Sequence, residues 1–403
     1  MSVDTDKNPD PVPPTPEGEQ PGANDMARWR AAWRELTAGS FLVSFLSVML
    51  AVIVGSLMIV FTNDEVRDSW TLDSVWNAIT GAYDAMFRGA IYNTRAEEFS
   101  AAIRPLTETL KYSAPLILAG LGVGLAFRVG LFNIGGRGQM LIGGAAAGWV
   151  GYQFDLPSPL HIALAVLAGL VFGGLWGGIA GLLKARTGAH EVIVTIMLNY
   201  VAYYLVFYAL SQQNLLQAPG SNNPKSPPMK DSAVLPGLLG DEYKLHLGFI
   251  FALLAVGIVW WLLNRSSLGF RLRAVGENPD AARTAGINVG KCYTLVMVFS
   301  GALMGLAGVN QILGTETSGI TNGLDAGIGF DAITVALLGR SNPVGILGAG
   351  LLFGAFKAGG YTMQTSEGIP VDIVLVVQSL IVLFLAAPPL VRAIFRLPAK
   401  ETA

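Results

Sequence analysis

A polar, glycine-rich stretch at residues 127–139 holds the side chains best suited to meet a dissolved molecule. It contains four glycines, two arginines, Asn133 and Gln139, and it lies between apolar segments at residues 113–127 and 139–153. Each segment has about 15 residues, whereas a bilayer core requires roughly 20. Unwound polar backbone is tolerated at membrane depth only beside protein or a water-filled path, and such interrupted segments indicate the route of a transported solute. The alternative is an ordinary cytoplasmic turn whose arginines follow the positive-inside rule.

Other aromatic, hydrogen-bonding and charged side chains extend this expected path. The neutral members are Phe132, Asn133, Gln139, Asn199 and Tyr200. For the last two, hydrogen bonding between neighbouring helices is the alternative role. Charged residues at apparent membrane depth are functional candidates by default. They gather near two hairpins as Arg128, Arg137, Asp325, Asp331 and Arg340. We place Asp331 on the path, and a position of these charges at the membrane interface is the alternative.

The loop at residues 265–291 contains a pattern that predicts a short isolated helix. Asn278 suits the N-cap, Pro279 the first helical position and Asp280 the positive helix end, while Gly286 is placed to end the helix in a left-handed cap. Two helical turns are not stable alone in water, so this helix needs a partner surface. That surface is either another protein, such as the ATPase of an importer, or this chain's own helices. The residues expected to take part in such coupling are Arg271, Arg273, Glu277, Asn278, Pro279, Asp280, Ala282, Arg283 and Gly286.

Several kinds of chemistry find no matching motif in the sequence. A P-loop requires G-x-x-x-x-G-K-[ST], but Gly290-Lys291 is followed by Cys292. The single cysteine excludes a disulfide framework, and the three histidines are scattered. No spacing of Ser, His and Asp suggests a triad, and the net charge of −2 argues against a nucleic-acid partner. We therefore expect a chain that is not an enzyme and carries no cofactor, with any ATP bound by a partner subunit.

The elements that position these residues are expected to be membrane helices. The chain is 52% hydrophobic and only 13% charged, and its 49 glycines suit close packing of membrane helices. Residues 41–397 are predicted to form one all-α polytopic membrane domain of about ten hydrophobic helices. Two of its hairpins are expected to be broken. The second spans residues 326–360, with its turn at residues 339–343.

The segments outside these helices differ in composition. Residues 1–25 hold six prolines and seven charged residues, which predicts a disordered cytoplasmic tail. Residues 26–40 are predicted to form an interfacial helix. Residues 63–111 and 211–246 are predicted outer loops, the first with a helix that has one apolar face. The placement of Lys and Arg puts the loop at 265–291 and both termini in the cytoplasm.

Four motifs resemble, in order, the permease subunits of bacterial ABC importers for nucleosides and simple sugars, within the larger group of ribose and branched-chain amino-acid permeases. They are FRVGLFNIGGRGQMLIGG, HEVIVTIMLNYVA, GFRLRAVGENPDAARTAGIN and GFDAITVALLGRSNPVGILGAGLLFG. The resemblance implies a type II ABC-importer-like permease in the bacterial plasma membrane, in contact with its lipids. It also implies cytoplasmic ABC ATPase subunits, an extracytoplasmic substrate-binding lipoprotein and a second permease subunit as partners, with the loop at 268–287 facing the ATPase. Family members usually carry Ala-Glu where this chain has Gly136-Arg137, so a role for an acidic side chain there is not carried over.

The sequence thus predicts a permease for a nucleoside, because the resemblance points to that substrate and because aromatic faces and neutral hydrogen-bonding groups suit an uncharged base and ribose. A permease for a simple sugar or a branched-chain amino acid is the alternative within transport. A self-sufficient secondary transporter is a further alternative, but the predicted coupling helix and the lack of a series of carboxylates argue against it. A membrane enzyme would need a paired acid and base, which the sequence does not offer.

Overall fold

The computed structural model describes residues 40–240 and 242–397. The expected tail at 1–25, and all but the last residue of the expected interfacial helix at 26–40, lie outside these residues. The described part is helical apart from its loops and one isolated antiparallel bridge between Gly237 and His246. Its first helices are α2 (Ser40–Thr62), α3 (Asp64–Asp68), α4 (Leu72–Ala90), α5 (Phe99–Phe127), α6 (Gly136–Gln153), α7 (Ser158–Thr187) and α8 (Glu191–Leu210). After a long loop follow α9 (Gly248–Arg265), α10 (Ser267–Glu277), α11 (Pro279–Thr284), α12 (Val289–Asn310), the π-helix η1 (Gln311–Thr315), α13 (Ile328–Leu338), α14 (Pro343–Glu367), α15 (Asp372–Ala386) and α16 (Pro388–Ile394).

Seven of the described helices are long and apolar enough to cross a membrane. They are α2, α5, α7, α8, α9, α12 together with η1, and α14, and two shorter apolar helices lie within α13 and α15. The expected number of about ten is therefore too high. The difference arises partly at α6, which has 18 residues but consists largely of glycine and alanine, and which is buried among its neighbours.

The two expected hairpins are present, but their arms differ from the prediction. α5 has 29 residues, because its first turns include residues that the sequence assigned to the outer loop at 63–111. α13 is short, with 11 residues, whereas α14 has 25. The helical conformation is interrupted between α13 and α14 at Arg340 and Ser341, whose φ angles are 52° and 51°. A short arm is thus confirmed for α13, and the predictions of short arms at residues 113–127 and in the second half of 326–360 are wrong.

The amphipathic helix expected within residues 63–111 is confirmed as α4. Val75, Ile79, Tyr83 and Met86 pack on the apolar cluster that α4 shares with α2, α14 and α15. This face holds the helix against the rest of the chain, so α4 is a packed part of the membrane domain in addition to being amphipathic.

Glycines allow α7 and α12 to touch backbone to backbone. A Cβ on Gly301 of α12 would lie 2.2 Å from the carbonyl oxygen of Gly173 on α7, and a Cβ on Gly305 would lie 2.0 Å from that of Gly169. No larger residue fits at these distances, which is the close approach that small residues permit between membrane helices.

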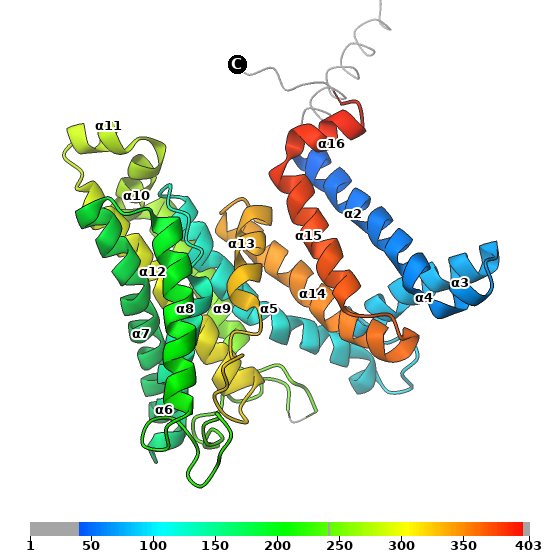
Figure 1. The fold of residues 1–403 in the computed structure, drawn as a ribbon, viewed down its shortest axis with the longest axis horizontal. Coiled ribbons are helices and arrows are strands. Elements are labelled where there is room, and N and C mark those ends of the chain that lie inside the picture. The colour runs from blue at the N-terminus through cyan, green and yellow to red at the C-terminus, as the bar shows by residue number, and fades with distance from the viewer. Residues whose placement is uncertain (1–39, 241, 398–403) are drawn as a thin grey trace, which may run out of the picture.

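Figure 1 shows two groups of helices, with α6, α7, α8, α9 and α12 in one and α2, α4 and α15 in the other. α5 and α14 pack on each other and extend between the groups. α10, α11 and α16 lie at one end of the molecule, and the first turns of α5 lie toward the other end (Figure 1). The hairpin helix α13 lies between the two groups.

Candidate functional site

Asn133 and Gln139 form a closed pair of amides where α5 turns into α6. Nδ2 of Asn133 donates to Oε1 of Gln139 (3.0 Å), and Nε2 of Gln139 donates to Oδ1 of Asn133 (3.1 Å). Nδ2 of Asn133 also donates to the hydroxyl of Ser300 on α12 (2.8 Å), which donates to the carbonyl oxygen of Gly122 on α5 (2.7 Å). Asn133 is 0% and Gln139 2% exposed. These bonds tie the turn to two long helices and leave little of either amide for a solute.

Asn199 supports the same turn from α8. Its Oδ1 accepts from the backbone N–H of Gly138 (2.8 Å), and its Nδ2 donates to the carbonyl oxygen of Ile134 (2.9 Å). A side chain thus satisfies an N–H in the first turn of α6, where no backbone partner exists. This geometry favours the role of Asn199 as a bond between helices over a role on the solute path. Tyr200, its neighbour in sequence, is 58% exposed on another face of α8.

The two hairpins meet at their turns and at their helix starts. Nε of Arg128, at the end of α5, donates to the carbonyl oxygen of Ser341, between α13 and α14 (3.0 Å). The first turn of α6 touches that of α13, because a Cβ on Gly329 would lie 2.5 Å from the Cα of Arg137. The sequence placed charged residues near both hairpins, and the structure brings the two hairpins into contact.

We call this contact the hairpin junction and define it by Arg137, Tyr203, Asp325, Asp331 and Lys357. Nε of Arg137 lies 3.3 Å from Oδ1 of Asp325, and its guanidinium carbon lies 5.0 Å from the ring centre of Tyr203. Nζ of Lys357 donates to the carbonyl oxygen of Ala326 (3.3 Å), and the charges of Lys357 and Asp325 both act on Asp331. The sequence singled out Arg137, Asp325 and Asp331 but missed Lys357 and Tyr203, which only the fold brings here.

Phe132 lies apart from the junction's charges. It is 40% exposed, and its ring stacks on that of Phe127 with 4.7 Å between the centroids. The residues expected on the path therefore separate into three sets: buried amides, exposed aromatics at Phe132 and Tyr200, and Asp331 among the junction charges.

The short helix predicted in the loop at 265–291 is confirmed as α11. Oδ1 of Asn278 accepts from the backbone N–H groups of Asp280 and Ala281, each at 3.0 Å, as an N-cap does. Gly286 has φ +81°, which is the left-handed conformation expected after the helix. Nη1 of Arg283 lies 2.9 Å from Oδ1 of Asp280. The sequence did not predict α10, which begins at a cap made by Ser266.

An apolar groove of about 530 Å³ lies between α10 and α11. Its walls include Phe270, which is 62% exposed, and the exposed residues Ala281 and Ala285. Arg271, Arg273, Glu277 and Asp280 are exposed beside it. Ala282 also lines the groove, but it is only 3% exposed and packs mainly inside this chain. A part of Ala282 in coupling stays a prediction, and Ala281 and Ala285 present the more exposed small-residue surface.

The chain is similar to known proteins over most of its length. Residues 106–386 match the family described as branched-chain amino acid transport system / permease component. A guanosine ABC transporter permease protein of Bacillus subtilis (strain 168) is 40% identical over 355 residues, covering 87% of this chain and 94% of that protein. A glucose ABC transporter permease protein of Haloferax volcanii is 34% identical, covering 84% and 85%. A second guanosine ABC transporter permease protein of the same Bacillus strain is 31% identical, covering 61% and 78%. No solved structure matches. The chain is a multi-pass membrane protein and belongs to the family of branched-chain amino acid transport system permease components.

Proposed function

We propose that this chain is the membrane subunit of an ATP-driven nucleoside importer and that a separate cytoplasmic ATPase docks on its α10–α11 end. The observation that carries the proposal is the capped helix α11 beside an open apolar groove, on a sequence that contains no P-loop of its own. An exposed apolar side chain such as Phe270 is costly in water, so a partner protein gains by covering it.

A single orientation in the membrane follows from this docking. The beginning of α2, the end of α16 and helices α10 and α11 lie at the same end of the molecule (Figure 1). The α10–α11 end carries Arg271, Arg273 and Arg283, which the positive-inside rule places in the cytoplasm. Both termini are then cytoplasmic, and a substrate-binding lipoprotein would deliver solute at the opposite end, near the start of α5.

The proposed path passes the hairpin junction. Charged side chains inside a membrane are tolerated where they pair or face water, so Arg137, Asp325, Asp331 and Lys357 mark a place that lipid does not fill. The first turns of α6 and α13 meet there, and helix N-termini attract electronegative groups of a solute. The framework of Asn133, Gln139 and Asn199 holds the turn in place rather than binding the solute.

The nucleoside is proposed as substrate because the guanosine permease relative spans nearly the whole chain at 40% identity. The rings of Tyr203 at the junction and of Tyr200 on the exposed face of α8 offer surfaces for a flat base. The second Bacillus guanosine permease supports a pairing of this chain with another, related permease. The glucose permease relative keeps a simple sugar as the second candidate.

Uptake by the complete complex in proteoliposomes tests this proposal. We expect labelled guanosine to accumulate when ATP is supplied to the ATPase side, and not when the ATPase subunits are omitted. Unlabelled nucleosides should compete, whereas glucose and leucine should not. Full competition by glucose or leucine without competition by nucleosides would reject the substrate. Accumulation driven by an ion gradient in the absence of ATP would reject the coupling.

A further inference from the structure

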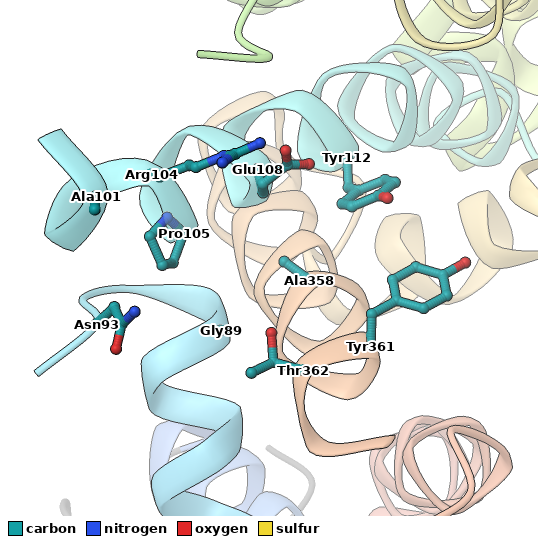
Figure 2. A pocket seen from close by; sticks show the side chains of 10 residues that line it. All are labelled: Gly89, Asn93, Ala101, Arg104, Pro105, Glu108, Tyr112, Ala358, Tyr361 and Thr362. Carbon is teal, nitrogen blue, oxygen red and sulfur yellow. The ribbon is translucent and has the colours of Figure 1, made fainter. Parts of the chain in front are cut away.

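A cavity of about 330 Å³ lies between α4, α5 and α14, and none of its lining residues is among those that define the hairpin junction. Figure 2 shows side chains from these helices, and from the segment after α4, around one space. Gly89 and Ala358 bring little or no side chain to it, so the larger groups define its walls. These are Asn93, Arg104, Glu108, Tyr112, Tyr361 and Thr362. The volume falls within the range of pockets that bind small molecules, roughly 300–1,000 Å³.

Two tyrosine rings stand at one side of this cavity, one from α5 and one from α14. The centroids of Tyr112 and Tyr361 are 5.9 Å apart, with the ring planes tilted by 38° (Figure 2). Tyr361 is 46% exposed, so part of its ring is free to be covered by a planar ligand. Flat bases stack on such rings whatever their identity, because every base has a π-face.

Arg104 and Glu108 lie one turn apart on α5 along another wall (Figure 2). Glu108 forms an ion pair with Lys111, whose ammonium lies 4.3 Å from the ring centre of Tyr112. None of the ion pairs between described residues involves Arg104. A guanidinium only donates hydrogen bonds, and a carboxylate only accepts them. Together they complement a ligand edge that carries a carbonyl oxygen beside an N–H, as an oxo-base such as guanine does.

The cavity lies on the route toward the hairpin junction. Tyr361 and Lys357 are one turn apart on α14, and residues four apart share a helix face. Lys357 donates to Ala326, in the segment that leads into α13. The cavity also lies near the start of α5, at the end of the molecule that faces away from α10 and α11 (Figure 1). A solute that enters from that end can therefore meet this cavity before it reaches the junction.

We infer that this cavity is an entry subsite for an oxo-base nucleoside, in which Tyr112 and Tyr361 stack on the base while Arg104 and Glu108 bind its carbonyl and N–H edge. Asn93 and Thr362 supply neutral groups for the ribose hydroxyls. The inference rests on the proposed function, because it assumes that nucleosides pass through this chain.

Kinetics of guanosine uptake by the complete complex test the subsite. Tyr361→Ala should raise the apparent KM about tenfold, the order expected when a base loses one stacking ring. Tyr361→Phe keeps the ring and should transport like the native chain. Trp261→Ala removes another exposed ring, 57% exposed on α9, and is the matched control that should leave the KM unchanged. Basal ATP hydrolysis should be equal in all four complexes, which shows that they assemble.

Photolabelling with 8-azidoguanosine locates the base independently of transport. Label should appear within residues 101–112 or 358–362, and excess guanosine should prevent it. If the native complex takes up guanosine but Tyr361→Ala keeps its KM and label falls elsewhere, the subsite is refuted while the proposed function stands. If the native complex takes up no nucleoside, the proposed function itself fails. Protection of this cavity by leucine but not by guanosine would instead assign it to a zwitterion and overturn the inference.

Discussion

Arg137 and Asp325 form an ion pair across the hairpin junction, with 3.3 Å between Nε and Oδ1. The Asp325 side chain is only 5% exposed, so water solvates its charge poorly and the arginine has to stabilise it. The Arg137 side chain is 32% exposed, so water also solvates its charge. The pair joins the first turn of α6 to the segment before α13.

The first prediction is that Arg137 and Asp325 have coupled effects on the free energy of unfolding. Arg137→Gln leaves Asp325 buried without its cation, and breaking a buried pair costs up to about 3–5 kcal/mol, less at a partly exposed site. Arg137→Gln/Asp325→Asn removes both charges and should recover much of that loss. Thermal unfolding in detergent of the native chain, Arg137→Gln, Asp325→Asn and the double variant measures the coupling, and strictly additive losses would show that the pair contributes nothing.

The second prediction concerns Asn133. Asn133→Leu removes the partner of Gln139 and Ser300 and should lower the free energy of unfolding by at least roughly 1–3 kcal/mol, because buried polar groups lose their hydrogen bonds. Lower yield of assembled complex should accompany the loss of transport. Asn77→Leu, at an exposed position on α4, is the control. A fully stable Asn133→Leu complex that fails only in transport would return Asn133 to the solute path.

The sequence was informative where one signal dominates and misleading where tertiary contacts decide. From the sequence, membrane helices were predicted at residues 41–62 and 191–210. α2 and α8 match these bounds within a residue, because each is a long uncharged or nearly uncharged apolar run between polar segments. α5 was not, because Arg104, Glu108 and Lys111 read as a loop outside the membrane, whereas in the structure they continue the helix, with Glu108 and Lys111 paired.

The candidate site shows the same limit. The cap of α11 is local, so Asn278 and Gly286 could be assigned from spacing alone. The partners of Asn133 and Asn199 come from distant helices, and the inward position of Ala282 depends on how α11 packs on its neighbours. No spacing rule contains that information.

The third prediction concerns the contact of α7 with α12. Gly301→Ala places a Cβ against the carbonyl oxygen of Gly173 and should destabilise the chain by about 1–3 kcal/mol, as overpacking does. Gly257→Ala is the matched control, because nothing lies within 4 Å of a Cβ added there. In α9 it should be neutral or stabilise by up to about 1 kcal/mol, since alanine is the better helix former. Equal melting temperatures for both variants would contradict the close contact.

The fourth prediction separates ATP hydrolysis from transport. Ala285→Glu adds bulk and charge to the exposed wall of the α10–α11 groove, and Gly286→Val strains the left-handed cap by about 1–2 kcal/mol. Both should weaken copurification of the ATPase or its response to loaded binding protein. Asn222→Glu, at an exposed position in the loop after α8, should do neither. Native ATPase association and transport rates in both groove variants would make α11 an ordinary surface turn.

The fifth prediction is an acid-sensitive stability that depends on His246, in the loop before α9. Burial, with the positive charge of Lys111, lowers the pKa of His246 to about 4. An unfolded histidine has a pKa of about 6.5, so only the unfolded chain takes up this proton between the two values. The contribution of the neutral imidazole is therefore complete above pH 6.5 and is lost as pH falls toward 4. His246→Gln should lose less stability than the native chain over this window in thermal unfolding. Parallel curves for the two proteins would rule the histidine out as the cause.

The backbone contact of α7 with α12 also restricts how the molecule can move. A screw motion of α12 by one residue, which combines a rotation of about 100° with a shift of about 1.5 Å, would bring the side chain of Ser300 or Ala302 to the place where only the hydrogen of Gly301 fits against Gly173. The two helices are thus fixed in register, and α6 is fixed to α12 in the same way, since a Cβ on Gly308 would lie 2.5 Å from the carbonyl oxygen of Met140. We therefore expect α6, α7 and α12 to move together as one block. Under the proposed transport function, we expect the change of access to involve the contact of that block with the segment before α13, at the pair of Arg137 with Asp325.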